Sequence, residues 1–95
     1  MAYYLLISAE ITDTDKYAGY REAVTPLITH FGGRYLVRGG DAEAFAGEYD
    51  GKRLVVLEFE SKQAARTFWD SPEYAEVSKL REGASTGNVV GVEGV

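Results

Sequence analysis

The sequence predicts an α+β fold in which four antiparallel strands carry two helical segments on one face. Three observations support this prediction. Apolar residues alternate with the two-residue period of strands near the N-terminus and in the middle of the chain. A three- and four-residue apolar period, typical of a helix, lies between them. Helix-capping and turn residues mark the boundaries, and the 95 residues are expected to form one domain, residues 1–95.

The first half of the chain predicts one strand and one long helix. The strand is expected from Tyr3 to Glu10, and the oxygen-bearing side chains of Thr12 to Asp15 suit a helix N-terminus. Pro26 lies inside the helix and is expected to bend it near Glu22 without dividing it. Gly32-Gly33 is expected to end it with a left-handed cap. The apolar stripe of this helix consists of Tyr17, Tyr20, Val24, Leu27, Ile28 and Phe31.

Two further strands are predicted in the middle of the chain. The second runs from Arg34 to Arg38, and Gly39-Gly40 is expected to break or bulge it before extended structure resumes from Glu43 to Tyr49. Asp50-Gly51 is typical of a two-residue hairpin turn. The third strand is expected from Arg53 to Glu60.

The last part of the chain predicts a second, interrupted helix and a final strand. Ser61 is expected to cap the helix, and Ser71-Pro72-Glu73 to restart it as far as about Glu82. A loop from Gly83 to Gly87 then leads to a strand from Asn88 to Val92. The order strand, helix, strand, strand, helix, strand is that of the ferredoxin-like fold.

Both faces of the predicted sheet contain apolar residues. A face that meets water should be mainly polar, but here the second face is mixed. The chain is also 45% apolar and 13% aromatic, which is generous for a domain of this size. We therefore predict a homodimer in which one sheet packs on another through the face that contains Tyr4, Leu6, Leu54 and Val56.

Composition excludes several classes of function. The chain has no cysteine and a single histidine, so neither thiolate nor histidine-cluster metal sites are expected, and no cofactor is predicted. The net charge of −5 without a basic run makes nucleic acid an improbable partner. No signal peptide and no apolar stretch of membrane-spanning length is recognisable, so we expect a cytoplasmic protein.

Four blocks of sequence carry a resemblance to a known family. They are Gly32 to Gly40, Arg53 to Phe59, Trp69 to Tyr74 and Val92 to Val95. In this order they resemble the domain-of-unknown-function family 1330. The resemblance implies a ferredoxin-like protomer of the dimeric α/β-barrel superfamily, in which two sheets face each other across a two-fold axis. That superfamily also contains cofactor-independent monooxygenases, haem-degrading enzymes and muconolactone isomerases, so the resemblance leaves function open.

Arg38 and Glu58 are the charged candidates for a site. Arg38 ends a strand beside two glycines and could anchor a small carboxylate, or form an ion pair with Glu58 or Glu43. Glu58 lies on the mixed face, where burial without a partner would raise its pKa and suit a general base. A simple hairpin register places it opposite Glu43, so that either a bulge at Gly39-Gly40 shifts the register or Arg38 or Arg34 neutralises the pair. We favour ion pairing for both residues.

His30 and the aromatic residues complete the candidate set. His30 could act as an acid or base, although its place in the last helical turn also suits an ordinary structural role. Tyr20, Trp69 and Tyr74 could line a pocket between helices and sheet, which Arg81 could also reach, although core packing is their commoner role.

We therefore predict a homodimer that binds a small organic acid or aromatic molecule. It is either a cofactor-independent enzyme of the monooxygenase or isomerase type, with Glu58 or His30 as base, or a non-catalytic structural or ligand-sensing dimer.

Overall fold

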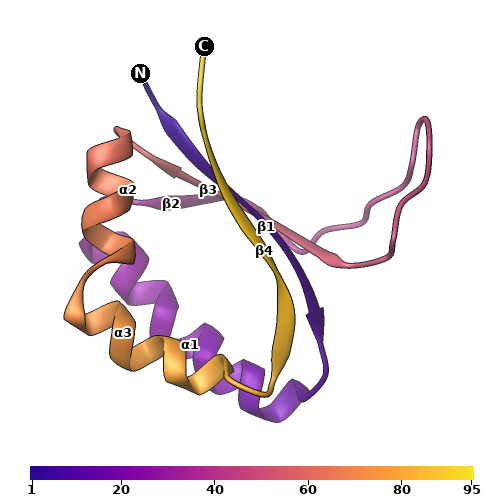
Figure 1. Cartoon of the computed structure of the whole chain (residues 1–95), viewed down its shortest axis with the longest axis horizontal. Coiled ribbons are helices and arrows are strands. Elements are labelled where there is room, and N and C mark those ends of the chain that lie inside the picture. The colour runs from indigo at the N-terminus through magenta and orange to yellow at the C-terminus, as the bar shows by residue number, and fades with distance from the viewer.

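The computed structural model describes all 95 residues and has the predicted order of elements. A four-stranded antiparallel sheet, with strand order β2-β3-β1-β4, carries the helices on one face (Figure 1). The elements are β1 (Tyr3–Ile11), α1 (Thr14–His30), β2 (Arg34–Arg38), β3 (Arg53–Phe59), α2 (Lys62–Trp69), α3 (Pro72–Ser78), the 3₁₀ turn η1 (Lys79–Arg81) and β4 (Ser85–Glu93).

Helix α1 begins and ends at the residues that the sequence marks. The Asp13 side chain caps it by accepting a hydrogen bond of 3.1 Å from the Lys16 amide. The helix remains continuous through Pro26. At its end Gly32 has a φ of 83°, and the Gly33 amide donates back to the Ile28 carbonyl over 2.9 Å. This is the left-handed cap that the double glycine predicts.

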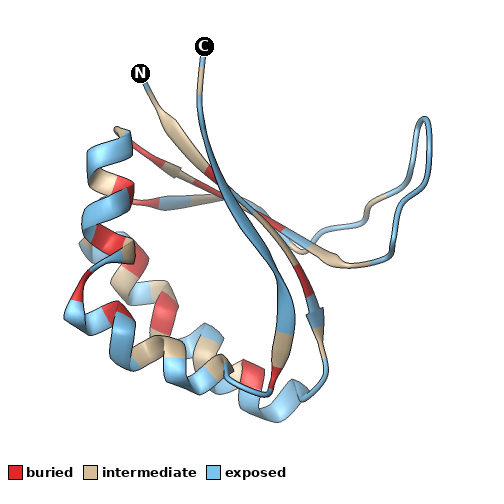
Figure 2. Cartoon of the chain, viewed as in Figure 1, coloured by how far each residue is buried: buried red, intermediate tan, exposed pale blue.

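The core lies where the helices meet the sheet (Figure 2). Phe59 of β3 and Phe68 of α2 stack with ring centroids 5.4 Å apart, and each is about 1% exposed. Gly33 lets the chain pass close to this pair, because a Cβ there would lie 2.7 Å from the Phe59 ring. The remaining core residues are Leu5, Val24, Ile28, Val55, Leu57, Ala65 and Tyr74.

The connection between β2 and β3 differs from the prediction. Residues 39–52 form a long loop that projects away from the sheet (Figure 1). The predictions of an extended segment from Glu43 to Tyr49 and of a hairpin turn at Asp50-Gly51 are therefore wrong. Gly51 has a φ of 80°, but Asp50 lacks the positive φ that the turn needs, and its side chain instead accepts from the Lys52 amide over 3.0 Å. The loop is rich in Ala, Gly and acidic residues, which have low β-propensity.

Strands β2 and β4 also differ from the prediction, β2 in the position of its bulge and β4 in its first residue. Strand β2 ends before Gly39-Gly40, as one of the two predicted alternatives has it, and its bulge lies between Tyr35 and Val37. Glu58 does not face Glu43, because residues 39–52 do not pair with β3; Glu58 stands opposite Arg34 instead. Strand β4 begins at Ser85, earlier than predicted, because the long strand β1 offers pairing partners as far as Ile11.

The face of the sheet opposite the helices is apolar and uncovered in the single chain. Leu6 of β1 is flanked in register by Val56 of β3 and Val90 of β4. Leu6 is 43% exposed and Val90 57% exposed. We call this surface the open face. It is the face that the sequence predicts to meet a second copy, and its aliphatic side chains are Leu6, Val37, Leu54, Val56, Val90 and Val92.

Candidate ligand-binding site

A cavity lies between the helix-facing side of the sheet and the helices. Its volume is about 70 Å³, and it is partly open to solvent. All four strands and all the helical elements contribute to its lining. This volume is small beside the several hundred Å³ of a pocket for a drug-sized ligand, so the enclosed part suits a small molecule.

The charged residues that line the cavity are all arginines. They are Arg21 of α1, Arg38 of β2, Arg53 of β3 and Arg81 of η1, and no Asp, Glu, Lys or His lines the cavity. None of the four forms an ion pair. The Nε atoms of Arg53 and Arg81 are buried without a hydrogen-bond partner. The cavity is therefore cationic although the whole chain carries a net charge of −5.

Arg38 extends from β2 to α1 across the cavity wall. Its Nη2 donates a hydrogen bond of 3.0 Å to the Thr25 hydroxyl, and its guanidinium lies 4.4 Å from the centroid of the Tyr35 ring. The ion pair with Glu58 or Glu43 that the sequence analysis favours does not form. Arg38 is thus positioned by a hydroxyl and an aromatic ring, which leaves its positive charge unneutralised.

Tyrosines and a tryptophan line the opposite side. The hydroxyls of Tyr20 and Tyr74 share a hydrogen bond of 2.9 Å, and the Trp69 ring lies 4.8 Å from that of Tyr74. The pKa of the Tyr20 phenol is raised well above its usual value, mainly by burial and to a smaller extent by the neighbouring Tyr74. Tyr20 therefore stays protonated near neutral pH, and either hydroxyl of the Tyr20–Tyr74 pair can be the donor of their shared hydrogen bond.

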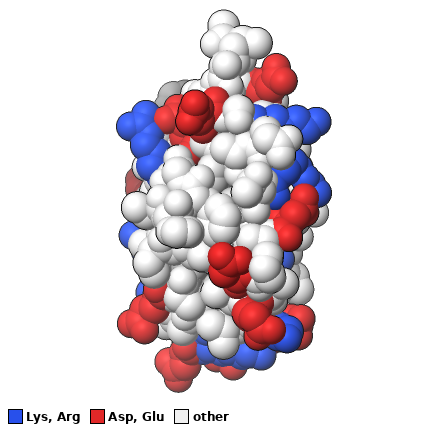
Figure 3. Space-filling view, turned by 90° about the vertical axis from the view of Figure 1, so that its left-hand side faces the viewer, with Lys and Arg blue, Asp and Glu red and all other residues white.

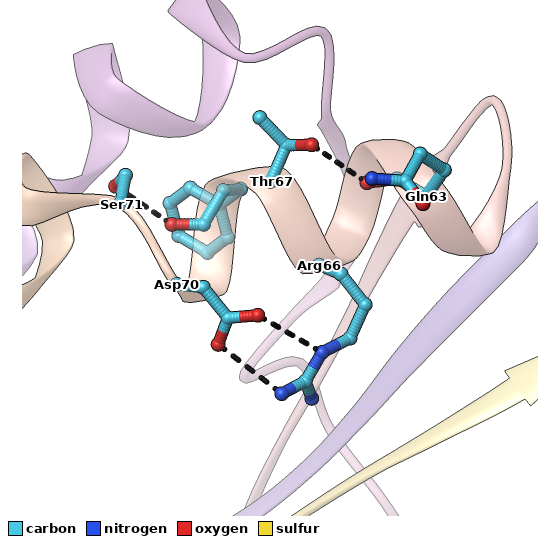
Figure 4. A network of polar contacts seen from close by, with 6 residues as sticks. Gln63, Arg66, Thr67, Asp70 and Ser71 are labelled. Atoms are coloured by element: carbon cyan, nitrogen blue, oxygen red, sulfur yellow. Dashed lines mark hydrogen bonds and ion pairs between the residues drawn. The ribbon is translucent and has the colours of Figure 1, made fainter.

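Local structure around Ser71 places the two aromatic residues of this wall. The Ser71 hydroxyl donates to the Phe68 carbonyl over 2.8 Å and accepts from the Tyr74 amide over 3.0 Å. Pro72 then occupies the first turn of α3. On the outer side of α2, Arg66 and Asp70 form an ion pair with N–O distances of 3.1 and 3.2 Å (Figure 4). The break between the helices is therefore fixed by hydrogen bonds.

Glu58 lies on the open face, across the sheet from the cavity. It stands in register with Arg34 on one side and Tyr4 on the other. The Arg34 Nε donates to Glu58 Oε1 over 2.6 Å. Hydrogen bonding from Arg34, and then from Tyr4, lowers the pKa of Glu58. The raised pKa expected of an unpaired Glu58 therefore does not occur, because Arg34 pairs with it.

His30 lies away from the cavity as well. It is exposed in the last turn of α1 and packs edge-on against the Phe31 ring, with the centroids 5.2 Å apart. Of the six predicted site residues, the structure thus brings Tyr20, Arg38, Trp69 and Tyr74 together and leaves Glu58 and His30 outside.

Sequence reasoning did not single out Arg21 and Arg53. Arg53 could have been found, since the two-residue alternation of β3 places it on the same face as Val55 and Leu57. No sequence pattern points to Arg21 as a cavity residue, because a polar residue on the flank of an amphipathic helix is common.

The surface on the helical side shows no patch of one charge. Acidic and basic side chains are interspersed there around uncharged areas (Figure 3). No helix of the chain has the length and hydropathy needed to cross a bilayer.

The fold and the cavity define a ferredoxin-like α+β protein with a small cationic pocket under its helices. The chain belongs to the family described as Domain of unknown function (DUF1330), whose sequence profile matches residues 2–95. No curated protein matches the sequence.

Solved structures share the fold at low sequence identity. A protein of unknown function from Rhodopseudomonas palustris is 20% identical, with a TM-score of 0.81 over 99% of this chain and 82% of its own. A dimeric ferredoxin-like protein of unknown function from Jannaschia sp. CCS1 is 15% identical, with a TM-score of 0.73 over 99% and 100%. A protein from Nitrosomonas europaea, provisionally described as an antibiotic biosynthesis monooxygenase, is 13% identical, with a TM-score of 0.52 over 95% and 89%. At these identities the likeness establishes the fold alone.

Proposed function

We propose that this chain binds a small organic anion in the cavity between its sheet and helices, and that it does so as a homodimer. The observation that carries the proposal is the set of cavity arginines, Arg21, Arg38, Arg53 and Arg81, none of them paired with an acid. Arg53 and Arg81 are half-buried with buried Nε atoms, and a partly desolvated guanidinium without a counter-ion is unfavourable. A carboxylate is the group that its planar donors fit best.

The remaining walls of the cavity select the body of the ligand. Aliphatic side chains from the sheet and the rings of Tyr17, Tyr20, Trp69 and Tyr74 supply apolar and aromatic surface. Such walls bind a hydrocarbon or aromatic skeleton, while the arginines orient its charged group. The ligand class is therefore a small aromatic or aliphatic carboxylic acid.

Binding without turnover is supported better than catalysis. A general base must lie within hydrogen-bond reach of the substrate, but no carboxylate or imidazole of the chain lines the cavity. The second candidate is a cofactor-independent enzyme, which has fold-level support from the description of the Nitrosomonas europaea protein. In that case the Tyr20 and Tyr74 hydroxyls would orient the substrate by hydrogen bonds.

The homodimer rests on the open face and on one relative. Four aliphatic side chains of that face are more than two-fifths exposed in the single chain: Leu6, Val37, Val90 and Val92. An apolar sheet face of this kind is stabilised by packing on another sheet. The relative from Jannaschia is described as dimeric. Since all four strands belong to one sheet, we also propose that residues 1–95 form a single domain.

Thermal unfolding in the presence of benzoate or its neutral analogue benzamide tests the binding proposal. At constant ionic strength and saturating concentration, benzoate should raise Tm by roughly several °C, and benzamide should not. Arg38→Gln should weaken benzoate binding about tenfold or more, because a charge-assisted hydrogen bond is lost.

Arg66→Gln is the matched control, since Arg66 pairs with Asp70 on the outside of α2 and does not line the cavity. Equal Tm shifts with benzoate and benzamide, or equal losses in the two arginine variants, would contradict an anion site in the cavity. The absence of any shift across a panel of aromatic and aliphatic carboxylates would overturn the proposed function.

A further inference from the structure

We propose that the ligand carries two anionic groups joined by an apolar body, with one group held by Arg38 and Arg53 and the other by Arg81. This inference rests on the proposed function and specifies its ligand class as a dicarboxylate. It follows from the way in which three of the four cavity arginines, Arg38, Arg53 and Arg81, divide into two sets at different flanks of α1.

The first set lies where β2 and β3 diverge into the loop. Arg38 stands opposite Val55 in register, and Arg53 precedes Val55 by two residues, so both arginines point from the same face of adjacent strands. Gly39 leaves room for the Arg53 guanidinium, because a Cβ there would come within 2.2 Å of Arg53 Nη1. The Nε of Arg53 is buried and unpartnered. A carboxylate here would therefore meet two guanidinium groups.

The second set is Arg81, whose guanidinium lies 6.0 Å from the centroid of the Tyr20 ring. Tyr20 belongs to the flank of α1 that faces α3, where it meets Tyr74. Thr25, which binds Arg38, follows Tyr20 by five residues and so lies roughly 140° farther around the helix axis. Arg38 and Arg81 thus approach the cavity from different flanks of the same helix.

Apolar side chains separate the two sets. Tyr17, Val24 and Ile28 of α1 face Leu5 and Leu57 of the sheet, and all five line the cavity and are less than a tenth exposed.

The buried Nε atoms of Arg53 and Arg81 each need an acceptor, since an unsatisfied buried donor is costly. A monocarboxylate can supply an acceptor at only one end and leaves the other guanidinium unpaired. Two carboxylates on an apolar skeleton satisfy both.

Calorimetric titration with matched acids tests this inference. The probes are straight-chain α,ω-dicarboxylates of four to eight carbons, each compared with the monocarboxylate of equal length at constant ionic strength. We expect the best dicarboxylate to bind at least about tenfold tighter than its monocarboxylate, which corresponds to about 1.4 kcal/mol. In Arg81→Gln the advantage of the dicarboxylate over its monocarboxylate should disappear.

Arg66→Gln should keep the full advantage, and Arg81→Met, which keeps the aliphatic stem, replaces Arg81→Gln if that variant does not fold. Monocarboxylates that bind as tightly as dicarboxylates at every length, or a dicarboxylate advantage that survives the loss of Arg81, would overturn the two-anion inference and leave the anion site in place. If no carboxylate of either series binds, both proposals fail.

Discussion

Arg34 and Arg38 are four residues apart in β2, yet their guanidinium groups serve opposite faces of the sheet. Arg34 pairs with Glu58 on the open face, whereas Arg38 reaches Thr25 on the helical side. In a regular strand, residues four apart share a face. The bulge between Tyr35 and Val37 adds one residue to β2, so that the residues after it face the opposite side of the sheet from the one expected. Arg38 therefore points toward the cavity.

The Arg34–Glu58 pair predicts a measurable pH dependence of stability. The pKa of Glu58 lies below its usual value of 4.5 in the folded chain. A lowered pKa contributes stability above the unfolded pKa, and this contribution is lost as the pH falls through the folded pKa. The difference in unfolding free energy between the native protein and Glu58→Gln should therefore be present at pH 7 and should shrink as the pH falls below 4.5.

Urea denaturation at fixed protein concentration measures this difference. Glu76→Gln is the control, because Glu76 pairs with Lys79 at the surface of α3 and should change little at pH 7 or at pH 3. A stability difference for Glu58→Gln that is the same at pH 7 and pH 3 would contradict the ionised pair.

At the scale of elements, the short helices α2 and α3 depend on their caps and on the core. They have eight and seven residues, which is too few for an isolated helix to be stable in water. Ser61 caps α2 through the Ala64 amide over 3.1 Å, and Ser71 caps α3. Helix capping by serine, which the sequence predicts, therefore positions Trp69 and Tyr74 at the cavity.

Ser71→Ala should destabilise the protein more than Ser61→Ala. Ser71 is 7% exposed and makes two hydrogen bonds, so its removal leaves the Tyr74 amide without its cap and should cost about 1–2 kcal/mol. Ser61 makes one such bond at a more exposed position, and its loss should cost about 0.5–1 kcal/mol. Urea denaturation of the two variants provides the comparison, and an equal or reversed order would show that the α2–α3 break does not depend on Ser71.

At the scale of the whole molecule, the two faces of the sheet have separate roles in our proposals. One face and the helices enclose the cationic cavity, and the open face is left for a second copy. The ion pair of Arg34 and Glu58 lies beside the aliphatic residues of the open face, where it would restrict the orientation of a partner.

Leu6→Lys should convert the proposed dimer to a monomer. Leu6 lies at the centre of the open face between Val56 and Val90, and a buried unpaired ammonium there is incompatible with sheet-on-sheet packing. Light scattering at micromolar concentration should give a dimer mass for the native protein and half of it for the variant. Ala75→Lys, at an exposed position of α3, should remain dimeric. A monomeric native protein would contradict the assembly.

The helix ends could be predicted from the sequence, because each depends on a few neighbouring residues. Ser61, Ser71-Pro72 and Gly32-Gly33 mark helix ends because capping needs only neighbouring residues. The hairpin at Asp50-Gly51 failed because a turn forms only if the strands on both sides pair, and residues 39–52 do not pair.

The sequence by itself determined the order of elements and the presence of apolar residues on both faces of the sheet. These depend on periodicity and capping, which are local properties of the chain. Only the tertiary structure decided which charges meet. The bulge in β2 turned Arg38 toward α1, and the register of β3 paired Glu58 with Arg34. The face of the sheet to which a side chain points depends on how the strands pair, and a shift of one residue in the register moves it to the other face.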